Sequence, residues 1–497
     1  MSENVRKGMA KGAAWMIGFR VVDQVIGLIS TIILARLLLP VDFGIVAMAM
    51  VIYALLELLG SLRTDVVLIQ KQDAGRGLYD TAWTVNLLLV TGEAVLLALL
   101  ARPVGAFYEE PRLVMVIYAL SFAMFLTCIK NIGIVDFRKH LEFHKEFIYL
   151  FSRRITSFLV TVLLAYIYRS YWALIIGIVI SRVVELILSY MMHPYRPRLC
   201  ISDWGEIYDF SKWLYLNNFA YFLNQRLPEF VVGKLSGLTS LGLFNMGYQI
   251  GTLPQTALAA PMNRAFLPGY AKLASDNDKL QRSFIDVVSI IALISIPAAA
   301  GLAAVAPYAV PILLTEKWNA AIPVMQAAAI TGLIGSITSN ASYACLAVGK
   351  PSYVTTMTII QMLIMALMMG VGCYYWNVTG AAYGVAGASI LTIPVFIYAT
   401  NKAIGIKVSA LIIAIHRQII GAFVMWVVLS QDVWSEYAHN YGPSVWQLAA
   451  MISIGAITYI TVLTFLWLLE RRPDGPEVYF ITYSMKGIKR ISGFSRA

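Results

Sequence analysis

The chain is predicted to be an all-helical, polytopic membrane protein, and three properties of its sequence predict this class. Hydrophobic residues make up 59% of the 497 residues and charged residues only 13%, about half the charged share of an ordinary soluble domain. About fourteen apolar segments approach the roughly 20 residues that a membrane-spanning helix needs. Basic residues concentrate in the connections on one side of these segments, as the positive-inside rule requires.

The apolar segments fall into two groups of six and a final pair. The first group covers approximately residues 12–35, 41–62, 81–101, 113–132, 147–168 and 171–192. The second group, whose first member is the most polar of all, covers approximately 210–233, 238–262, 284–306, 322–348, 353–376 and 379–400. The final pair covers approximately 410–429 and 445–469. This pattern predicts an N-lobe (1–200), a C-lobe (201–405), helices 13 and 14 (406–470) and a basic cytoplasmic tail (471–497).

The distribution of positive charge tests the predicted topology. Of the 38 lysines and arginines, 26 lie in the loops and tails on the side of the N-terminus, 6 on the opposite side and 6 within spans or at their ends. Because a missed or false helix would exchange the two sides downstream, this bias supports an even number of spans with both termini in the cytoplasm. It also accounts for the net charge of +11 without a nucleic-acid partner.

A short pattern repeats between the two groups of six segments. A cation and leucine are followed at identical spacing by a glycine and a methionine: Arg36-Leu37, Gly44 and Met48 first, then Lys234-Leu235, Gly242 and Met246. Both copies connect the first and second helix of a predicted half. The repeat favours two six-helix lobes with a substrate site near the membrane midplane.

Five arginines lie inside apolar runs, where a bare charge costs roughly 2.5–3.5 kcal/mol at the bilayer centre: Arg20, Arg153, Arg154, Arg182 and Arg226. Three of them have a carboxylate one helical turn later, at Asp23, Glu185 and Glu229. This spacing places both charges on one helix face, where each offsets the burial of the other. The pairs are interpreted either as structural links between helices or as groups that face a polar transported substrate.

Several sequence motifs resemble the polysaccharide-exporter branch of the MOP flippase superfamily. The motifs are Phe210-Ser211-Lys212-Trp213, Gly233-Lys234-Leu235, Leu241-Gly242-Leu243-Phe244-Asn245-Met246, Leu253-Pro254, Ala260-Pro261, Arg264 with Phe266-Leu267-Pro268, Tyr171-Trp172-Ala173-Leu174-Ile175-Ile176-Gly177, Pro194-Tyr195-Arg196-Pro197-Arg198 and Gly349-Lys350-Pro351. The resemblance covers nearly the whole chain and is most specific in its middle third. It implies a Wzx-type flippase with two MATE-like lobes and two extra C-terminal helices. The chain departs from the family at Arg226-Leu227-Pro228-Glu229, where the family pattern has an aspartate close to the arginine.

The resemblance implies that the chain moves undecaprenyl-pyrophosphate-linked oligosaccharides to the outer leaflet of the cytoplasmic membrane, with polysaccharide polymerase or export machinery as further partners. Arginine suits such a substrate because its planar fork matches phosphate oxygens, and amides suit sugar hydroxyls. The candidate substrate-binding residues are Arg20, Asp23, Arg153, Arg154, Arg182, Glu185, Asn218, Asn224, Arg226, Glu229 and Arg264. Which glycan is carried is not encoded in any of these residues.

Other functions are less consistent with the sequence. It has no phosphate-binding loop of the G-x-x-x-x-G-K-[ST] type and no cluster of histidines or cysteines with metal-ligand spacing, so no cofactor, metal or catalytic residue is predicted. Glu57 and Glu93 lie within spans without a basic residue one turn away, which makes them candidates for ion coupling or for plain structural acids. A multidrug or organic-cation extruder of the same superfamily is the alternative. A membrane glycosyltransferase is disfavoured because no large acidic outer loop is present.

Overall fold

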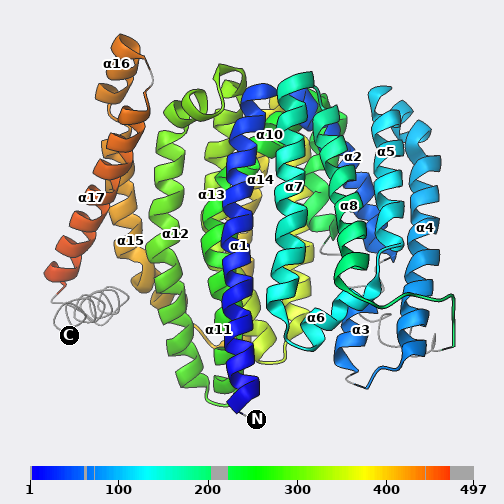
Figure 1. Ribbon diagram of the computed structural model, residues 1–497. Helices are drawn as coiled ribbons and strands as arrows, with labels where there is room; N and C mark the ends of the chain where they lie inside the picture. Colours follow the sequence, from blue (N-terminus) through cyan, green and yellow to red (C-terminus); the bar gives the residue numbers. More distant parts are fainter. Residues whose placement is uncertain (1–2, 61–63, 72, 203–221, 443, 471–497) are drawn as a thin grey trace, which may run out of the picture. The chain divides into compact units, whose positions relative to one another are not determined.

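Every regular element in the described part of the chain is a helix. The computed structural model describes residues 3–60, 64–71, 73–202, 222–442 and 444–470, and the chain divides into two compact units, Met1–Gly242 and Leu243–Ala497. Figure 1 shows the helices of both units, coloured along the sequence. The predicted lobe boundary at residue 200 falls next to residues 203–221, which lie outside the described residues, so it stays a prediction.

The described residues contain ten helices that are long and apolar enough to cross a membrane, or eleven if one bent pair counts as a span. One of the ten, α14 (Pro351–Ile404), contains two predicted segments. It is broken at Trp376 and Asn377, where the backbone is not helical and where the sequence predicts a boundary. The predicted seventh segment begins among residues outside the described part. The all-helical membrane class is therefore confirmed, whereas the count of fourteen stays a prediction.

The first unit consists mainly of long helices that pack side by side. Helix α7 lies between α1 and α8, and α5 packs against both α4 and α8 (Figure 1). After α5 the chain turns by 72° into a short helical segment, η1 with α6, instead of continuing straight. The elements are α1 (Glu3–Leu37), α2 (Pro40–Gly60), α3 (Thr64–Gln70), α4 (Arg76–Phe107), α5 (Arg112–Cys128), η1 (Ile132–Val135), α6 (Asp136–Lys139), α7 (Phe143–Tyr168) and α8 (Trp172–Met192).

The two glycines of the repeated sequence pattern meet within the first unit. A Cβ atom on Gly44 of α2 would lie 1.8 Å from the carbonyl oxygen of Leu238, and one on Gly242 would lie 1.8 Å from that of Pro40. Only glycine lets the first turn of α2 approach the first turn of α10 so closely. The repeat therefore marks a reciprocal backbone contact.

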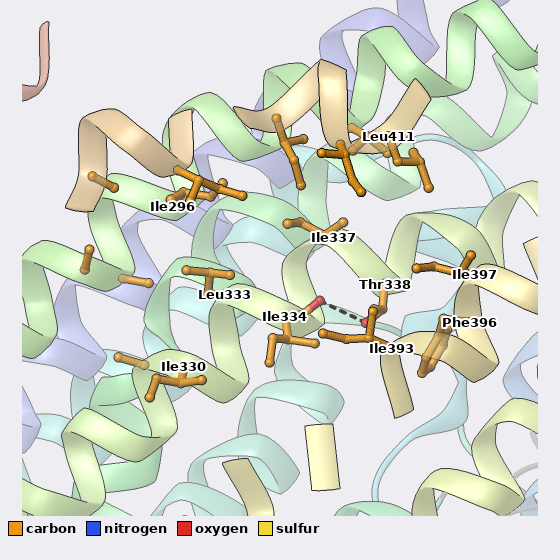
Figure 2. Close-up of a pocket in the computed structure, with 18 of the residues that line it drawn as sticks. Ile296, Ile330, Leu333, Ile334, Ile337, Thr338, Ile393, Phe396, Ile397 and Leu411 are labelled. Atoms are coloured by element: carbon orange, nitrogen blue, oxygen red, sulfur yellow. Dashed lines mark hydrogen bonds between the residues drawn. The ribbon is translucent and has the colours of Figure 1, made fainter. Parts of the chain in front are cut away.

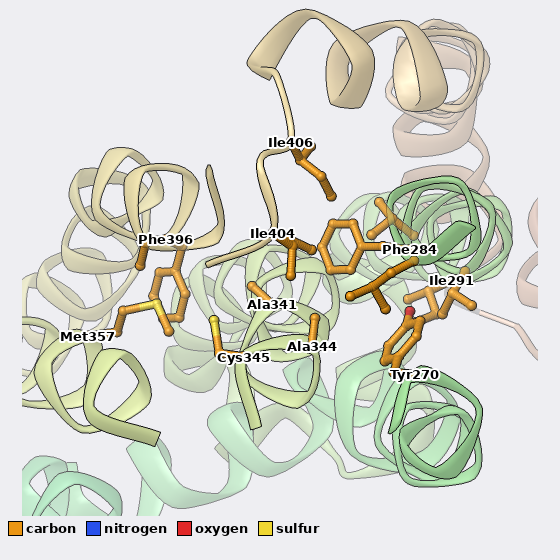
Figure 3. Packing of buried hydrophobic residues seen from close by; sticks show 14 of the residues in the cluster. Tyr270, Phe284, Ile291, Ala341, Ala344, Cys345, Met357, Phe396, Ile404 and Ile406 are labelled. Carbon is orange, nitrogen blue, oxygen red and sulfur yellow. The ribbon is translucent and has the colours of Figure 1, made fainter. Parts of the chain in front are cut away.

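The second unit is built around α13, which packs against both α12 and α14. Its core contains Tyr270, Phe284, Cys345, Met357 and Phe396, which converge from four helices in Figure 3. Between α10 and α11 the chain forms a π-helical turn that begins at Pro254. The elements are the part of α10 (Gly237–Gly251) that follows Gly242, η2 (Pro254–Ala259), α11 (Ala260–Leu273), α12 (Asn277–Leu313), η3 (Glu316–Ala321), α13 (Ile322–Ala347), α14, α15 (Val408–Leu429), α16 (Asp432–Tyr441) and α17 (Val445–Leu469).

Candidate functional site

A polar cavity of about 500 Å³ lies in the first unit. It is lined by residues of α2, α3, α4, α6, α7 and α8 and of the turn after α5. Helices α3 and α6 lie at the end of this unit where α1 begins (Figure 1), so the cavity occupies the same end as the N-terminus of α1. Its charged lining residues are Glu57, Asp65, Lys130, Arg138, Glu146, Arg153, Arg182 and Glu185.

Three cations converge on one carboxylate in this cavity. The Glu185 side chain is only 5% exposed, and its oxygens lie 3.1 Å from Lys130 Nζ, 3.2 Å from Arg153 Nη1 and 2.9 Å from Arg182 Nη1. The three cations are more open, with side chains between 23% and 33% exposed. We call Lys130, Arg153 and Arg182 the cation cradle. With Glu185 the cradle carries a net charge of +2, which the other charged residues that line the cavity offset.

The cradle depends on the bend after α5. Trp83 of α4 donates its indole N–H to the Lys130 carbonyl oxygen at 3.1 Å, and the next backbone N–H, of Asn131, donates to Ser189 Oγ of α8 at 3.0 Å. These bonds hold the turn against α4 and α8, so Lys130 points toward Glu185. The Tyr149 hydroxyl donates to the Glu185 carbonyl oxygen at 3.3 Å and fixes α7 against α8 at the same level.

The remaining charges of the cavity balance the cradle. Arg138 of α6 forms an ion pair with Glu146 of α7. Its Nη1 also lies 3.8 Å from Asp65 Oδ2 of α3. Glu57 of α2 is exposed and interacts electrostatically with Arg182. Four cations and four carboxylates therefore line the cavity. An entering anion meets cations that already have carboxylate partners.

Two of the three predicted arginine–acid pairs are confirmed. Arg182 pairs with Glu185, and Arg226 donates to Glu229 Oε1 at 2.8 Å, which settles the partner of Arg226. The predicted pairing of Arg20 with Asp23 is wrong. Asp23 instead lies 2.9 Å from Arg154 Nε, because α7 packs beside α1 and brings Arg154 across the interface.

The other predicted site residues do not join the cradle. Arg20 and Arg264 are exposed and line neither this cavity nor the groove described below. Asn224 is half-buried with a partner of its own, and Asn218 lies outside the described residues. Glu93 is only 9% exposed, and its Oε1 has no hydrogen-bond partner among the described residues. It lies close enough to Glu57 for their charges to interact. Ion coupling through this pair stays a prediction.

Four charged lining residues were missed by sequence reasoning: Asp65, Lys130, Arg138 and Glu146. The two cations were interpreted as ordinary loop charges of the positive-inside type. Lys130 is 55 residues from Glu185, so no local spacing connects them. The only available signal was the apolar stretch Ile132–Val135 between Lys130 and Arg138, which indicates that this connection turns back into the protein.

A second, apolar cavity of about 840 Å³ lies within the second unit, between α12, α13, the second half of α14, and α15. We call it the apolar groove. Figure 2 shows its wall, where Leu333, Ile337, Ile393, Ile397 and Leu411 lie around one open space. No charged residue is among the residues that line it.

The few polar side chains in the groove bond to nearby backbone. Thr338 donates its hydroxyl to the Ile334 carbonyl oxygen at 2.9 Å (Figure 2), and Thr400 donates to Phe396 O at 2.6 Å. Gln326 donates to the Ala303 carbonyl oxygen at 3.1 Å. Because these donors are already used, the wall offers a ligand mainly hydrocarbon surface.

Comparison with known proteins places this architecture in a family. A family model described as polysaccharide biosynthesis protein matches residues 33–323, more than half of the chain. The chain belongs to this family. The polysaccharide biosynthesis relatives include the lipopolysaccharide biosynthesis protein WzxC of Escherichia coli K12, 27% identical over 67% of this chain and 69% of WzxC. The succinoglycan biosynthesis transport protein ExoT of Rhizobium meliloti 1021 is 20% identical over 94% of this chain and 95% of its own length.

Solved structures of transporters share the fold. The lipid II flippase MurJ, in an inward closed conformation, superimposes with a TM-score of 0.73 at 13% identity over 93% of this chain and all of MurJ. An inward-facing multidrug resistance transporter of the MATE family superimposes with a TM-score of 0.61 at 14% identity, over 77% of this chain and 94% of the transporter chain. These structures confirm the predicted fold, and the chain is a multi-pass membrane protein of this polysaccharide biosynthesis family.

Proposed function

We propose that this polysaccharide biosynthesis protein is a flippase that moves an undecaprenyl-pyrophosphate-linked oligosaccharide across the cytoplasmic membrane by alternating access. The observation that carries the proposal is the cation cradle, where three cations surround one carboxylate inside a membrane unit. Guanidinium groups bind phosphate oxygens with charge-assisted, often bidentate hydrogen bonds. The names of WzxC and ExoT, which refer to lipopolysaccharide biosynthesis and succinoglycan transport, support a glycan substrate.

The apolar groove is the proposed site of the polyprenyl tail. A lipid-linked oligosaccharide carries both a strongly charged pyrophosphate and a long hydrocarbon chain, and these parts need chemically different surfaces. The groove supplies aliphatic and aromatic side chains without a charge, and burial of apolar surface contributes about 25 cal/mol per Å². Such a wall offers an organic cation no carboxylate to pair with its charge. Each surface matches the chemistry of one part of an amphipathic anion.

The proposed direction of transport requires the cradle to face the cytoplasm in one state. The cavity lies at the end of the first unit where α1 begins, and the charge bias assigns that end to the cytoplasm. We expect reporter fusions after Lys145 and at the C-terminus to report cytoplasm, and a fusion after Glu110 to report the outside. An external signal from the C-terminal fusion would contradict the even number of spans.

A flipping assay in proteoliposomes tests the function directly. Purified protein should move a fluorescent undecaprenyl-pyrophosphate oligosaccharide between leaflets at a rate well above that of empty vesicles. Excess undecaprenyl pyrophosphate should compete, whereas lipophilic cations should neither compete nor be transported. Transport of an organic cation without movement of the lipid-linked sugar would favour the multidrug alternative.

A further inference from the structure

We propose that Glu185 is an internal counter-anion. It occupies the cation cradle when no substrate is bound, and the phosphate of the substrate displaces it from the three cations. The inference deepens the proposed function, since it concerns how the same site binds and releases its ligand. It rests on the proposed function only for the identity of the natural ligand. The chemistry that the cradle recognises is a phosphate or pyrophosphate group.

The geometry indicates that the three cations share one carboxylate, which has fewer oxygens and less negative charge than three cations can bind. Glu185 Oε1 lies 3.1 Å from Lys130, and Oε2 lies 3.2 Å from Arg153 and 2.9 Å from Arg182. A carboxylate supplies two oxygens and one negative charge, whereas a pyrophosphate supplies more oxygens and a higher charge. The cations come from α7, from α8 itself and from the turn after α5, so three separate segments supply them.

The exposure of the side chains indicates which group is accessible from the cavity. The Glu185 side chain is 5% exposed, whereas Lys130, Arg153 and Arg182 are 33%, 31% and 23% exposed. A ligand in the cavity can therefore contact all three cations without first contacting Glu185. As the ligand forms bonds with the same donors, the Glu185 bonds weaken.

The repulsion between the three cations explains why the cradle needs this carboxylate. Three uncompensated cations inside a membrane protein would repel each other and lose their solvation, which is strongly destabilising. The nearest other carboxylates have separate positions: Glu146 and Asp65 accompany Arg138, and Glu57 faces Arg182 from α2. Glu185 is the carboxylate that contacts all three cradle cations among the described residues.

A counter-anion of this kind both weakens binding and speeds release. It weakens phosphate binding, because part of the interaction with the ligand replaces an existing interaction. It also speeds release, because Glu185 returns to the cations as the ligand leaves. A purely structural Glu185 would have neither effect, and its removal would only weaken the site.

The test replaces Glu185 with glutamine, which keeps the shape of the side chain and removes its charge. Inorganic pyrophosphate is titrated into purified protein, and both the dissociation constant and the thermal midpoint are measured at constant ionic strength. We expect Glu185→Gln to unfold at a lower temperature than wild type without pyrophosphate. We expect it to bind pyrophosphate at least tenfold more tightly and to gain more thermal stability from it, because a ligand of the folded state stabilises by RT ln(1 + [L]/Kd).

The matched control is Glu110→Gln, which removes a carboxylate from an arginine pair outside the cavity; it should leave pyrophosphate affinity unchanged. If Glu185→Gln does not fold, Glu185→Asp keeps the charge but withdraws it by one methylene, and it should show a smaller increase in affinity. Equal or weaker pyrophosphate binding by the variant that folds would overturn the inference, as would the absence of pyrophosphate binding in both variant and wild type. Because this binding is measured without lipid or export, failure of the flipping assay would overturn the proposed function and leave this result standing.

Discussion

Replacement of Arg182 with alanine is expected to abolish most flipping of the lipid-linked oligosaccharide while the protein still folds and inserts. Arg182 contributes a charged hydrogen bond to the cradle, and loss of such a bond to a phosphate costs about 1.5–3 kcal/mol, roughly a 10- to 150-fold loss of affinity. Insertion should survive, because Glu185 keeps Lys130 and Arg153 as partners. The measurement is the initial flipping rate in proteoliposomes that contain equal amounts of protein.

A lysine at position 182 separates charge from geometry. It restores the positive charge but not the planar fork that binds two phosphate oxygens, so it should restore stability more fully than flipping. Arg112→Ala is the matched control, since Arg112 forms an exposed pair with Glu110 away from the cavity. Normal flipping by Arg182→Ala would show that the cradle is a structural link between α5, α7 and α8 rather than a substrate site.

The sequence predicted those parts of the site that depend on neighbours along one helix. Arg182 with Glu185 and Arg226 with Glu229 are three residues apart, and helix geometry alone places such residues on one face. The same spacing failed for Arg20 and Asp23, because Arg154 on another helix competes for the carboxylate. Spacing identifies a possible partner, but helix packing decides which of several partners is used.

The contribution of Lys130 was beyond sequence reasoning for a related reason. A lysine just after a membrane helix normally marks the cytoplasmic side, and the apolar stretch Ile132–Val135 that follows it does not identify Glu185 as its partner. The role of Lys130 depends on the 72° bend after α5 and on two hydrogen bonds that hold the turn. Trp83, which donates to the Lys130 carbonyl oxygen, is 47 residues from Lys130, and Ser189, which accepts from the Asn131 N–H, is 58 residues from Asn131. These contacts become visible only when α4, α5 and α8 are assembled.

The apolar groove could not be predicted because its wall has the composition of any lipid-facing surface. Ile330 and Ile412 line the groove, whereas Ile294 of α12 is exposed elsewhere, and the sequence contains no feature that distinguishes them. In soluble proteins an apolar stripe on a helix indicates the core. In a membrane protein the same stripe fits the core, the lipid boundary or a tail-binding groove, so only the packing of α12 to α15 separates these cases.

Filling the apolar groove is expected to impair flipping without affecting the cradle. Ala300 of α12 and Ile337 of α13 both line the groove and are only partly buried, so a tryptophan at either position should extend into the open space. Each methylene of a polyprenyl tail that loses its contact costs about 0.8 kcal/mol, so the loss of a few contacts should reduce flipping roughly tenfold or more. Pyrophosphate affinity should remain at the wild-type value, because the altered residues belong to the second unit and the cradle to the first.

Ile294→Trp provides the matched control, since Ile294 is on the same helix as Ala300, is 39% exposed and does not line the groove. It should flip the substrate at the wild-type rate. A second comparison uses a substrate whose lipid is shortened to a few isoprene units. If the groove holds the tail, the short substrate should lose less from Ala300→Trp than the full-length one, because less hydrocarbon depends on the filled space. Equal flipping of the long substrate by Ala300→Trp, Ile337→Trp and wild type would mean that the groove holds ordinary membrane lipid and that the tail stays in the bilayer during transport.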